Sequence, residues 1–275
     1  MLNFQIQFLL IISVLLLTYQ RLGKYHTFAF AVTLMAINPV TTALCFQNST
    51  VLYITLTATI FLLRKNELLA DSERYLYFFL IVGICTSCFD FLTYPFVSLG
   101  IPLGFFVMLN KEKFYHLSVR NALKEMFHCS FAWGFGYVGM WSVKWILATL
   151  LTRYNVLVDA FYNALASKLP SAAQEFTFYQ VLSKNFYALS GSYIFVLAIF
   201  ILYMIYRAIK NRQNIYFNKT MAAIFTFIIA LPFIWYAVVM KHSYIHDFLV
   251  YRELAISIFG ITCITVEILS ERMKS

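Results

Sequence analysis

A succession of long apolar runs is the feature that most limits what this chain can fold into. Hydrophobic residues make up 61% of the sequence, charged residues only 12%, and the mean hydropathy is +0.75. Soluble domains carry roughly 25% charged residues, so this composition is typical of a protein that lies largely in a lipid bilayer. We predict one membrane domain, residues 1–275, folded as an all-α polytopic transmembrane helix bundle.

The apolar runs predict about nine spans. Their approximate ranges are 4–20, 27–46, 50–63, 75–93, 96–109, 129–151, 186–206, 220–240 and 247–269. Two of them, 50–63 and 96–109, are short for a bilayer crossing, so they are predicted to be hydrophobic hairpin halves or re-entrant pieces. The first run lacks a preceding basic region and a small-residue cleavage site, which favours a retained helix over a signal peptide.

The distribution of Lys and Arg predicts the orientation, because cytoplasmic loops retain these residues during insertion. An external N-terminus and a cytoplasmic C-terminus place 15 of the 21 inside the cell: Arg21, Lys24, Arg64, Lys65, Arg74, Lys111, Lys113, Arg120, Lys124, Arg207, Lys210, Arg212, Lys219, Arg272 and Lys274. The predicted location is therefore the cell membrane. The net charge of +9 is interpreted as contact with anionic membrane lipids, which requires no nucleic acid partner.

Two segments outside the spans carry their own patterns. Residues 110–128 alternate basic and apolar side chains, which predicts a cytoplasmic amphipathic connector in the headgroup plane. Residues 152–185 form the longest external loop, and the apolar spacing near 156–165 predicts a short helix there that ends before Pro170. The pair Cys85 and Cys88 is interpreted as a helix packing face, and neither a metal site nor a cofactor is predicted.

Charged and histidine side chains inside or next to apolar helices are rare, and they mark paired or functional sites. On the predicted topology six of them gather in the outer half of the membrane: Asp90, Lys144, His242, His246, Arg252 and Glu253. If 242–253 is one helix, His242, His246 and Glu253 project to a common side. Such a group either satisfies hydrogen bonds where a helix meets water or binds a phosphate headgroup.

Asp90 has two interpretations. It is either a catalytic general base that faces the outer leaflet, or a ligand of backbone amides freed where Pro95 interrupts a helical hairpin. Lys144 is expected to contact an acid, with Asp90 preferred over Glu253. The candidate substrate-binding residues are Lys144, His242, His246, Arg252 and Glu253.

Three stretches carry a family resemblance: "SCFDFLTYPFVSLGIPLG", "FGYVGMWSVKW" and "HSYIHDFLVYRELAIS". They resemble the C-terminal part of uncharacterised polytopic membrane proteins of Gram-positive bacteria, which are distantly similar to GT-C-type glycosyltransferases. That resemblance implies a polyprenyl-phosphate-linked substrate at the external face. The first external loop, "QNST", lacks the acidic residue that such enzymes usually carry there.

Three functions are therefore compared. The first is a GT-C-like glycosyltransferase or relative that binds a polyprenyl-phosphate lipid. The second is a non-catalytic membrane subunit, with a partner membrane subunit, or a truncated inactive fragment. The third is a transporter or lipid flippase, for which neither midplane charges nor internal repeats are evident.

Overall fold

The computed structural model describes residues 1–69, 72–168, 177–191 and 218–270, with isolated residues between 198 and 206. Over these ranges the chain is helical and contains no strand. The longer helices are α1 (Leu2–Leu22), α2 (Lys24–Ile37), α4 (Phe46–Lys65), α5 (Ser72–Phe89), α6 (Val97–Leu109), α8 (Val119–Thr152), α9 (Val156–Lys168), α10 (Phe178–Ser190), α12 (Lys219–Val238) and α15 (Leu254–Ser270). The short ones are α3 (Pro39–Ala43), η1 (Asn66–Leu69), α7 (Lys111–His116), α13 (Met240–Ile245), α14 (Asp247–Val250) and η2 (Tyr251–Glu253).

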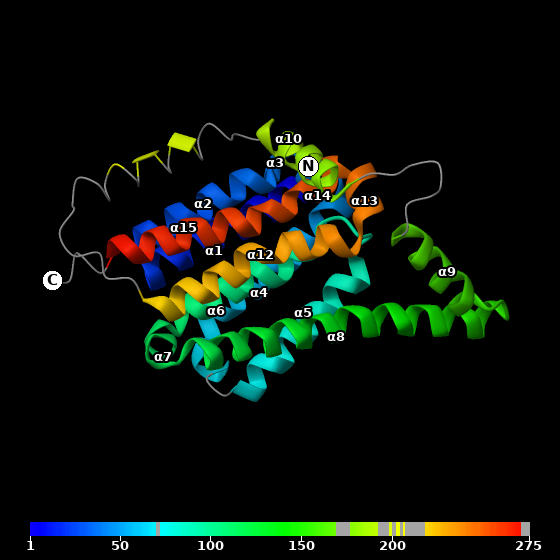
Figure 1. Ribbon diagram of the computed structural model, residues 1–275, viewed down its shortest axis with the longest axis horizontal. Coiled ribbons are helices and arrows are strands. Elements are labelled where there is room, and N and C mark those ends of the chain that lie inside the picture. The colour runs from blue at the N-terminus through cyan, green and yellow to red at the C-terminus, as the bar shows by residue number, and fades with distance from the viewer. Residues whose placement is uncertain are drawn as a thin grey trace.

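The long helices run back and forth between two ends of the bundle (Figure 1). One end holds the N-terminus, α3, α10, α13 and α14, and we call it the histidine end because His242 and His246 lie there. At the other end, the basic end, α2, α7 and α15 meet. There Glu267 forms an ion pair with Lys111 and accepts hydrogen bonds from the His26 Nε2 at 3.1 Å and from the Tyr115 hydroxyl.

Four described helical stretches are long and apolar enough to cross a membrane: Leu2–Leu22, Phe46–Leu69, Lys219–Val238 and Asp247–Glu267. The described residues thus form an all-α helical bundle, and the chain has the composition of a membrane protein, as predicted. The total of about nine spans remains a prediction, and most of the expected span 186–206 lies outside the described residues.

Helix α6 forms the centre of the bundle, because every residue from Val97 to Met108 is buried. It packs against α4, α15, α5 and α12. Gly100 and Gly104 allow α15 to approach closely, since a Cβ at either position would lie within 2.4 Å of Ile256 or 2.6 Å of Phe259. A helix without a lipid-facing side explains why its apolar run has no polar face in the sequence.

Helices α5 and α8 form the most extensive helix pair. A Cβ at Gly83 would lie 2.1 Å from the carbonyl oxygen of Trp133, and one at Gly136 would lie 2.3 Å from that of Leu80. The two backbones therefore touch at small residues, which is how helices associate in lipid where no hydrophobic driving force exists.

Several boundaries differ from those expected. The segment 119–128 is the beginning of the 34-residue α8, so only α7 remains as a separate part of the predicted connector 110–128. The run 27–46 is divided at Asn38, which has φ 56° and whose side chain accepts from the Thr41 amide at the start of α3. α9 lies where a short external helix was expected, and α10 begins inside the expected loop 152–185.

Candidate functional site

The segment 90–96 between α5 and α6 is non-helical backbone at the histidine end. α6 has 13 residues and is roughly 20 Å long, whereas the hydrocarbon core of a bilayer measures about 30 Å. In the predicted bilayer, this segment lies within or close to membrane depth. Such backbone is tolerated only where protein groups satisfy its amides and carbonyls. Three of the six predicted site residues, Asp90, His242 and Glu253, make such contacts with this segment.

Asp90 holds the start of the segment and is 4% exposed. Its carboxylate accepts hydrogen bonds from the amides of Leu92 at 3.0 Å and Thr93 at 2.9 Å, and from the Thr93 hydroxyl. The Tyr137 hydroxyl of α8 donates a fourth bond at 3.0 Å. Both carboxylate oxygens are thus engaged by the chain itself, which is the second of the two interpretations from the sequence.

His242 and Glu253 hold the middle and the end of the segment. The Nε2 of His242 lies 2.7 Å from the carbonyl oxygen of Leu92, so the ring carries its proton on Nε2 and donates it. Leu92 has a left-handed φ of 61°. The bond from its amide to Asp90 and the bond from His242 to its carbonyl stabilise this conformation. Glu253 is fully buried, and its Oε1 accepts from the Phe96 amide at 3.1 Å, at the N-terminus of α6.

Arg252 is 4% exposed, and its guanidinium donates hydrogen bonds to backbone carbonyls and to one side-chain hydroxyl. Its Nε donates to the Ile37 carbonyl at 2.9 Å, one terminal nitrogen donates to the carbonyls of Phe248 and Leu249, and the other donates to the Thr41 hydroxyl. The guanidinium therefore ties the break between α2 and α3 to η2. A phosphate would have to displace these contacts.

Lys144 does not contact Asp90, so that expectation is wrong. Its ammonium donates to the carbonyl oxygens of Ser87 at 2.6 Å and Cys88 at 2.9 Å, in the last turn of α5. The last carbonyls of a helix have no partner within the helix and carry partial negative charge, so a cation is stabilised there. The two carbonyl oxygens therefore stabilise the charge of the Lys144 ammonium without an acidic partner.

The two histidines of this end lie side by side. Their ring centroids lie 4.6 Å apart, and both residues are partly exposed. The predicted single helix through 242–253 is wrong, because the chain breaks at His246, between α13 and α14. The common face with Glu253 is therefore lost, and His242 and His246 remain as a pair.

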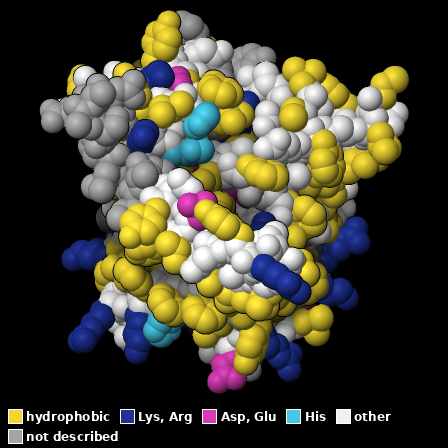
Figure 2. Space-filling view, turned by 90° about the vertical axis from the view of Figure 1, so that its right-hand side faces the viewer, with side chains coloured by type: hydrophobic (Ala, Val, Ile, Leu, Met, Phe, Trp, Pro, Cys, Tyr) yellow, Lys and Arg dark blue, Asp and Glu magenta, His cyan; other side chains and the backbone are white. Residues whose placement is uncertain are grey.

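Lys184 of α10 belongs to this site and was missed by the sequence prediction. Its ammonium lies 3.1 Å from Asp247 and donates to the Tyr244 carbonyl at 2.8 Å. Figure 2, which looks onto the histidine end, shows histidine side chains beside basic and acidic ones on a surface rich in hydrophobic side chains. No sequence pattern connects Lys184 to residues some sixty positions later, since only the packing of α10 on α13 joins them.

Burial lowers the pKa of His242 from its ordinary value of 6.5. The hydrogen bond to the Leu92 carbonyl raises the pKa in part, and the adjacent His246 lowers it. His242 is therefore neutral at pH 7, with Nδ1 as an acceptor. Across the described residues, no three His, Cys, Asp or Glu side chains are grouped so that they could hold a metal ion.

The chain matches no protein-family model, no curated protein and no solved structure.

Proposed function

We propose that this protein binds the phosphate of a polyprenyl-phosphate-type lipid at the histidine end, and that it acts as a non-catalytic membrane subunit. The observation that carries the proposal is the open pair His242 and His246. Asp90, Lys144, Arg252 and Glu253 are engaged by the chain itself, whereas the two imidazoles lie 4.6 Å apart and partly exposed, and His242 is bonded to the chain through Nε2 alone.

The pair has the chemistry of an anion site. A bound phosphate favours the protonated form of His242, in which Nδ1 becomes a donor to the phosphate while Nε2 keeps its bond to the Leu92 carbonyl. Charge-assisted bonds of this kind are roughly twice as strong as neutral ones. Lys184 adds a cation, which Asp247 partly offsets. The positive-inside rule supports an external histidine end, because most of the described Lys and Arg residues lie toward the opposite end (Figure 1).

The hydrogen bonds of Asp90 and the burial of Glu253 favour binding over catalysis. A general base must be able to accept a proton from the substrate, yet Asp90 already accepts four hydrogen bonds and Glu253 is fully buried. In a GT-C-like transferase, which the sequence resemblance implies, neither Asp90 nor Glu253 is placed to act as the base. The transporter alternative gains no support from the described residues.

Binding of undecaprenyl phosphate to the full chain in nanodiscs tests the proposal, with undecaprenol as the ligand without phosphate. Replacing both histidines by Ala should weaken binding of the phosphate lipid about tenfold or more and leave binding of undecaprenol unchanged. His128→Ala, an exposed histidine near the start of α8, is the matched control. Equal affinity for both lipids would overturn the phosphate site.

A second measurement addresses catalysis. Incubation with a polyprenyl-phosphate sugar should give no sugar transfer to water or to an acceptor alcohol by the chain alone. Transfer that disappears in Asp90→Asn would overturn the non-catalytic assignment and restore the transferase.

A further inference from the structure

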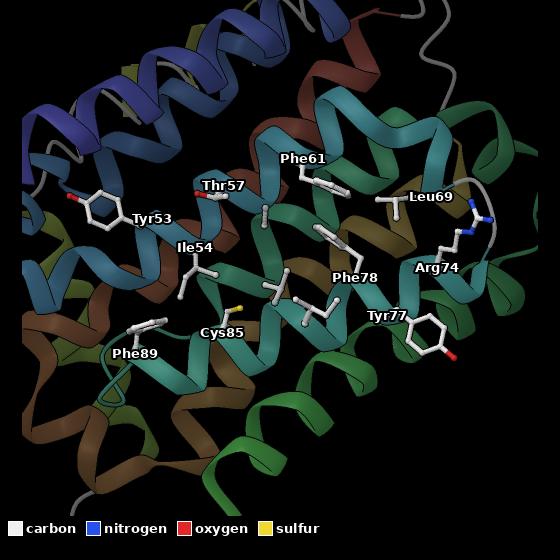
Figure 3. A pocket seen from close by; sticks show the side chains of 13 residues that line it. Tyr53, Ile54, Thr57, Phe61, Leu69, Arg74, Tyr77, Phe78, Cys85 and Phe89 are labelled. Carbon is white, nitrogen blue, oxygen red and sulfur yellow. The ribbon is translucent and has the colours of Figure 1, made fainter. Parts of the chain in front are cut away.

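A long apolar groove lies between α4 and α5 (Figure 3). It has a volume of about 640 Å³. Thirteen residues line it: Tyr53, Ile54, Thr57, Ala58, Phe61, Leu69, Arg74, Tyr77, Phe78, Ile81, Val82, Cys85 and Phe89. Nearly all of these side chains are hydrophobic or aromatic, and Arg74 is the one charged residue among them. The volume is within the ~300–1,000 Å³ typical of ligand sites.

Arg74, the charged residue of the lining, lies at one end of the groove (Figure 3). Tyr53 and Phe89 lie at the end nearer the histidine end, whereas Leu69, Arg74 and Tyr77 lie at the other (Figure 3). The Arg74 side chain is exposed, and one terminal nitrogen donates to the Leu68 carbonyl at 3.1 Å. That single bond holds the guanidinium at the mouth and uses one of its five N–H donors.

Among the charged residues near this end of the groove, Arg74 is the one that lines it. Glu73, the next residue in sequence, lines a different pocket between α5 and α8 together with Leu76, Leu80 and Phe131. Arg64 and Lys65 in the last turn of α4 add positive charge at this end, which Glu67 of η1 partly offsets.

We propose that this groove binds one acyl chain of a phospholipid from the leaflet at the basic end, with the lipid phosphate against Arg74. Water is a poor occupant, because the lining offers few hydrogen-bond partners. An acyl chain that reaches the bilayer midplane spans ~15 Å, and the distance along α5 from Arg74 to Cys85 is ~16 Å. A guanidinium at headgroup level is a bidentate donor to phosphate oxygens.

The α4–α5 site is independent of the proposed function, because it lies between other helices and rests on a different observation. Phosphatidylglycerol with a diazirine in its acyl chain would be photo-crosslinked to the full chain in nanodiscs, and the labelled peptides identified by mass spectrometry. Diacylglycerol with the same chains supplies the ligand without phosphate. We expect phosphatidylglycerol to label α4 and α5 at Ile54, Phe78 or Ile81.

Two variants separate the tail from the headgroup. Thr57→Trp, at an exposed position inside the groove, should reduce labelling of the groove by both lipids about tenfold, because the indole occupies the space of the chain. Arg74→Gln should reduce labelling by phosphatidylglycerol about tenfold and leave that by diacylglycerol unchanged. The matched controls are Val138→Trp, exposed on α8, and Arg120→Gln, exposed at the basic end.

Thermal unfolding of each variant establishes that it has folded. Labelling spread evenly along the lipid-facing side of α8 would overturn the groove as a site. Equal effects of Arg74→Gln and Arg120→Gln would overturn the phosphate contact. Labelling of the groove by a polyprenyl phosphate in competition with phosphatidylglycerol would overturn the phospholipid as occupant, while loss of polyprenyl-phosphate binding in the histidine variants alone would leave the groove unaffected.

Discussion

Replacing Asp90 tests whether this carboxylate holds the segment 90–96 or performs chemistry. In Asp90→Ala the amides of Leu92 and Thr93 and the hydroxyl of Tyr137 lose their acceptor at a site that is 4% exposed. Each buried unsatisfied group costs ~1–3 kcal/mol. Allowing for partial relaxation, we expect a loss of ~4 kcal/mol of unfolding free energy, or about 8–16 °C in Tm.

Asp90→Asn distinguishes acceptor geometry from charge. The amide oxygen can still accept from the amide and hydroxyl of Thr93, and Tyr137 can rotate to accept from the new NH₂ group. The Leu92 amide then faces a donor, so about one hydrogen bond is lost at a cost of ~1–2 kcal/mol. The Asn variant should therefore be clearly more stable than the Ala variant.

A thiol-reactive dye provides the assay, because Cys129 and Cys263 are buried and become accessible only on unfolding. Cys45, Cys85 and Cys88, which are exposed or partly exposed, are first replaced by Ser in every variant. Asp159→Ala, an exposed acid on α9, is the control and should leave Tm unchanged. If Asp90→Ala is as stable as this control, the carboxylate does not hold the segment and the reasoning fails.

Two further predictions concern packing and pH. Gly83→Ala and Gly136→Ala should each lower stability by ~1–3 kcal/mol, because the new Cβ would overlap a backbone carbonyl of the facing helix. Gly134→Ala and Gly139→Ala have open space at the Cβ and should not destabilise, so equal Tm losses in all four would contradict the close α5–α8 contact. Because burial lowers the pKa of His242 below 6.5, the unfolded chain takes up a proton at a higher pH than the folded one, and stability should fall as pH decreases below about 6.5. His242→Gln should flatten the Tm-versus-pH curve between pH 7 and 5, and curves that stay parallel would exclude His242 as the cause.

The sequence predicted the helices better than the contacts between them. Apolar runs identify α1, α12 and α15 directly, because lipid and protein interior impose the same requirement on side chains. The run 50–63 was expected to be too short for a crossing, but it lies within Phe46–Leu69, which is long enough. The short run 96–109 is the helix α6, and its interpretation as a hairpin half or re-entrant piece stays a prediction. Its depth in the bundle was not readable, since burial depends on which helices surround it.

The individual partners of the charged residues were mostly not predictable. Lys144 was expected to contact an acid, but the carbonyls at the end of α5 are equally good partners and leave no trace in the side-chain sequence. Tyr137 could have been found, because it precedes Lys144 by seven residues and so shares its face of α8. Arg252 was interpreted as a phosphate ligand. Two of its partners, Ile37 and Thr41, lie instead beside the helix break at Asn38, more than 200 positions earlier in the sequence.

The contacts of the segment 90–96 also constrain the order in which the protein can be completed during synthesis. The Leu92 carbonyl and the Phe96 amide are satisfied by residues 150 and 157 positions later in the chain. Until the ribosome has made α13 and η2, these groups have no partner from that part of the protein in the membrane. In a nascent chain that pauses before Lys241, the segment 90–96 between α5 and α6 should therefore keep unpaired backbone groups. We expect membrane quality-control proteases to recognise such a chain as a substrate.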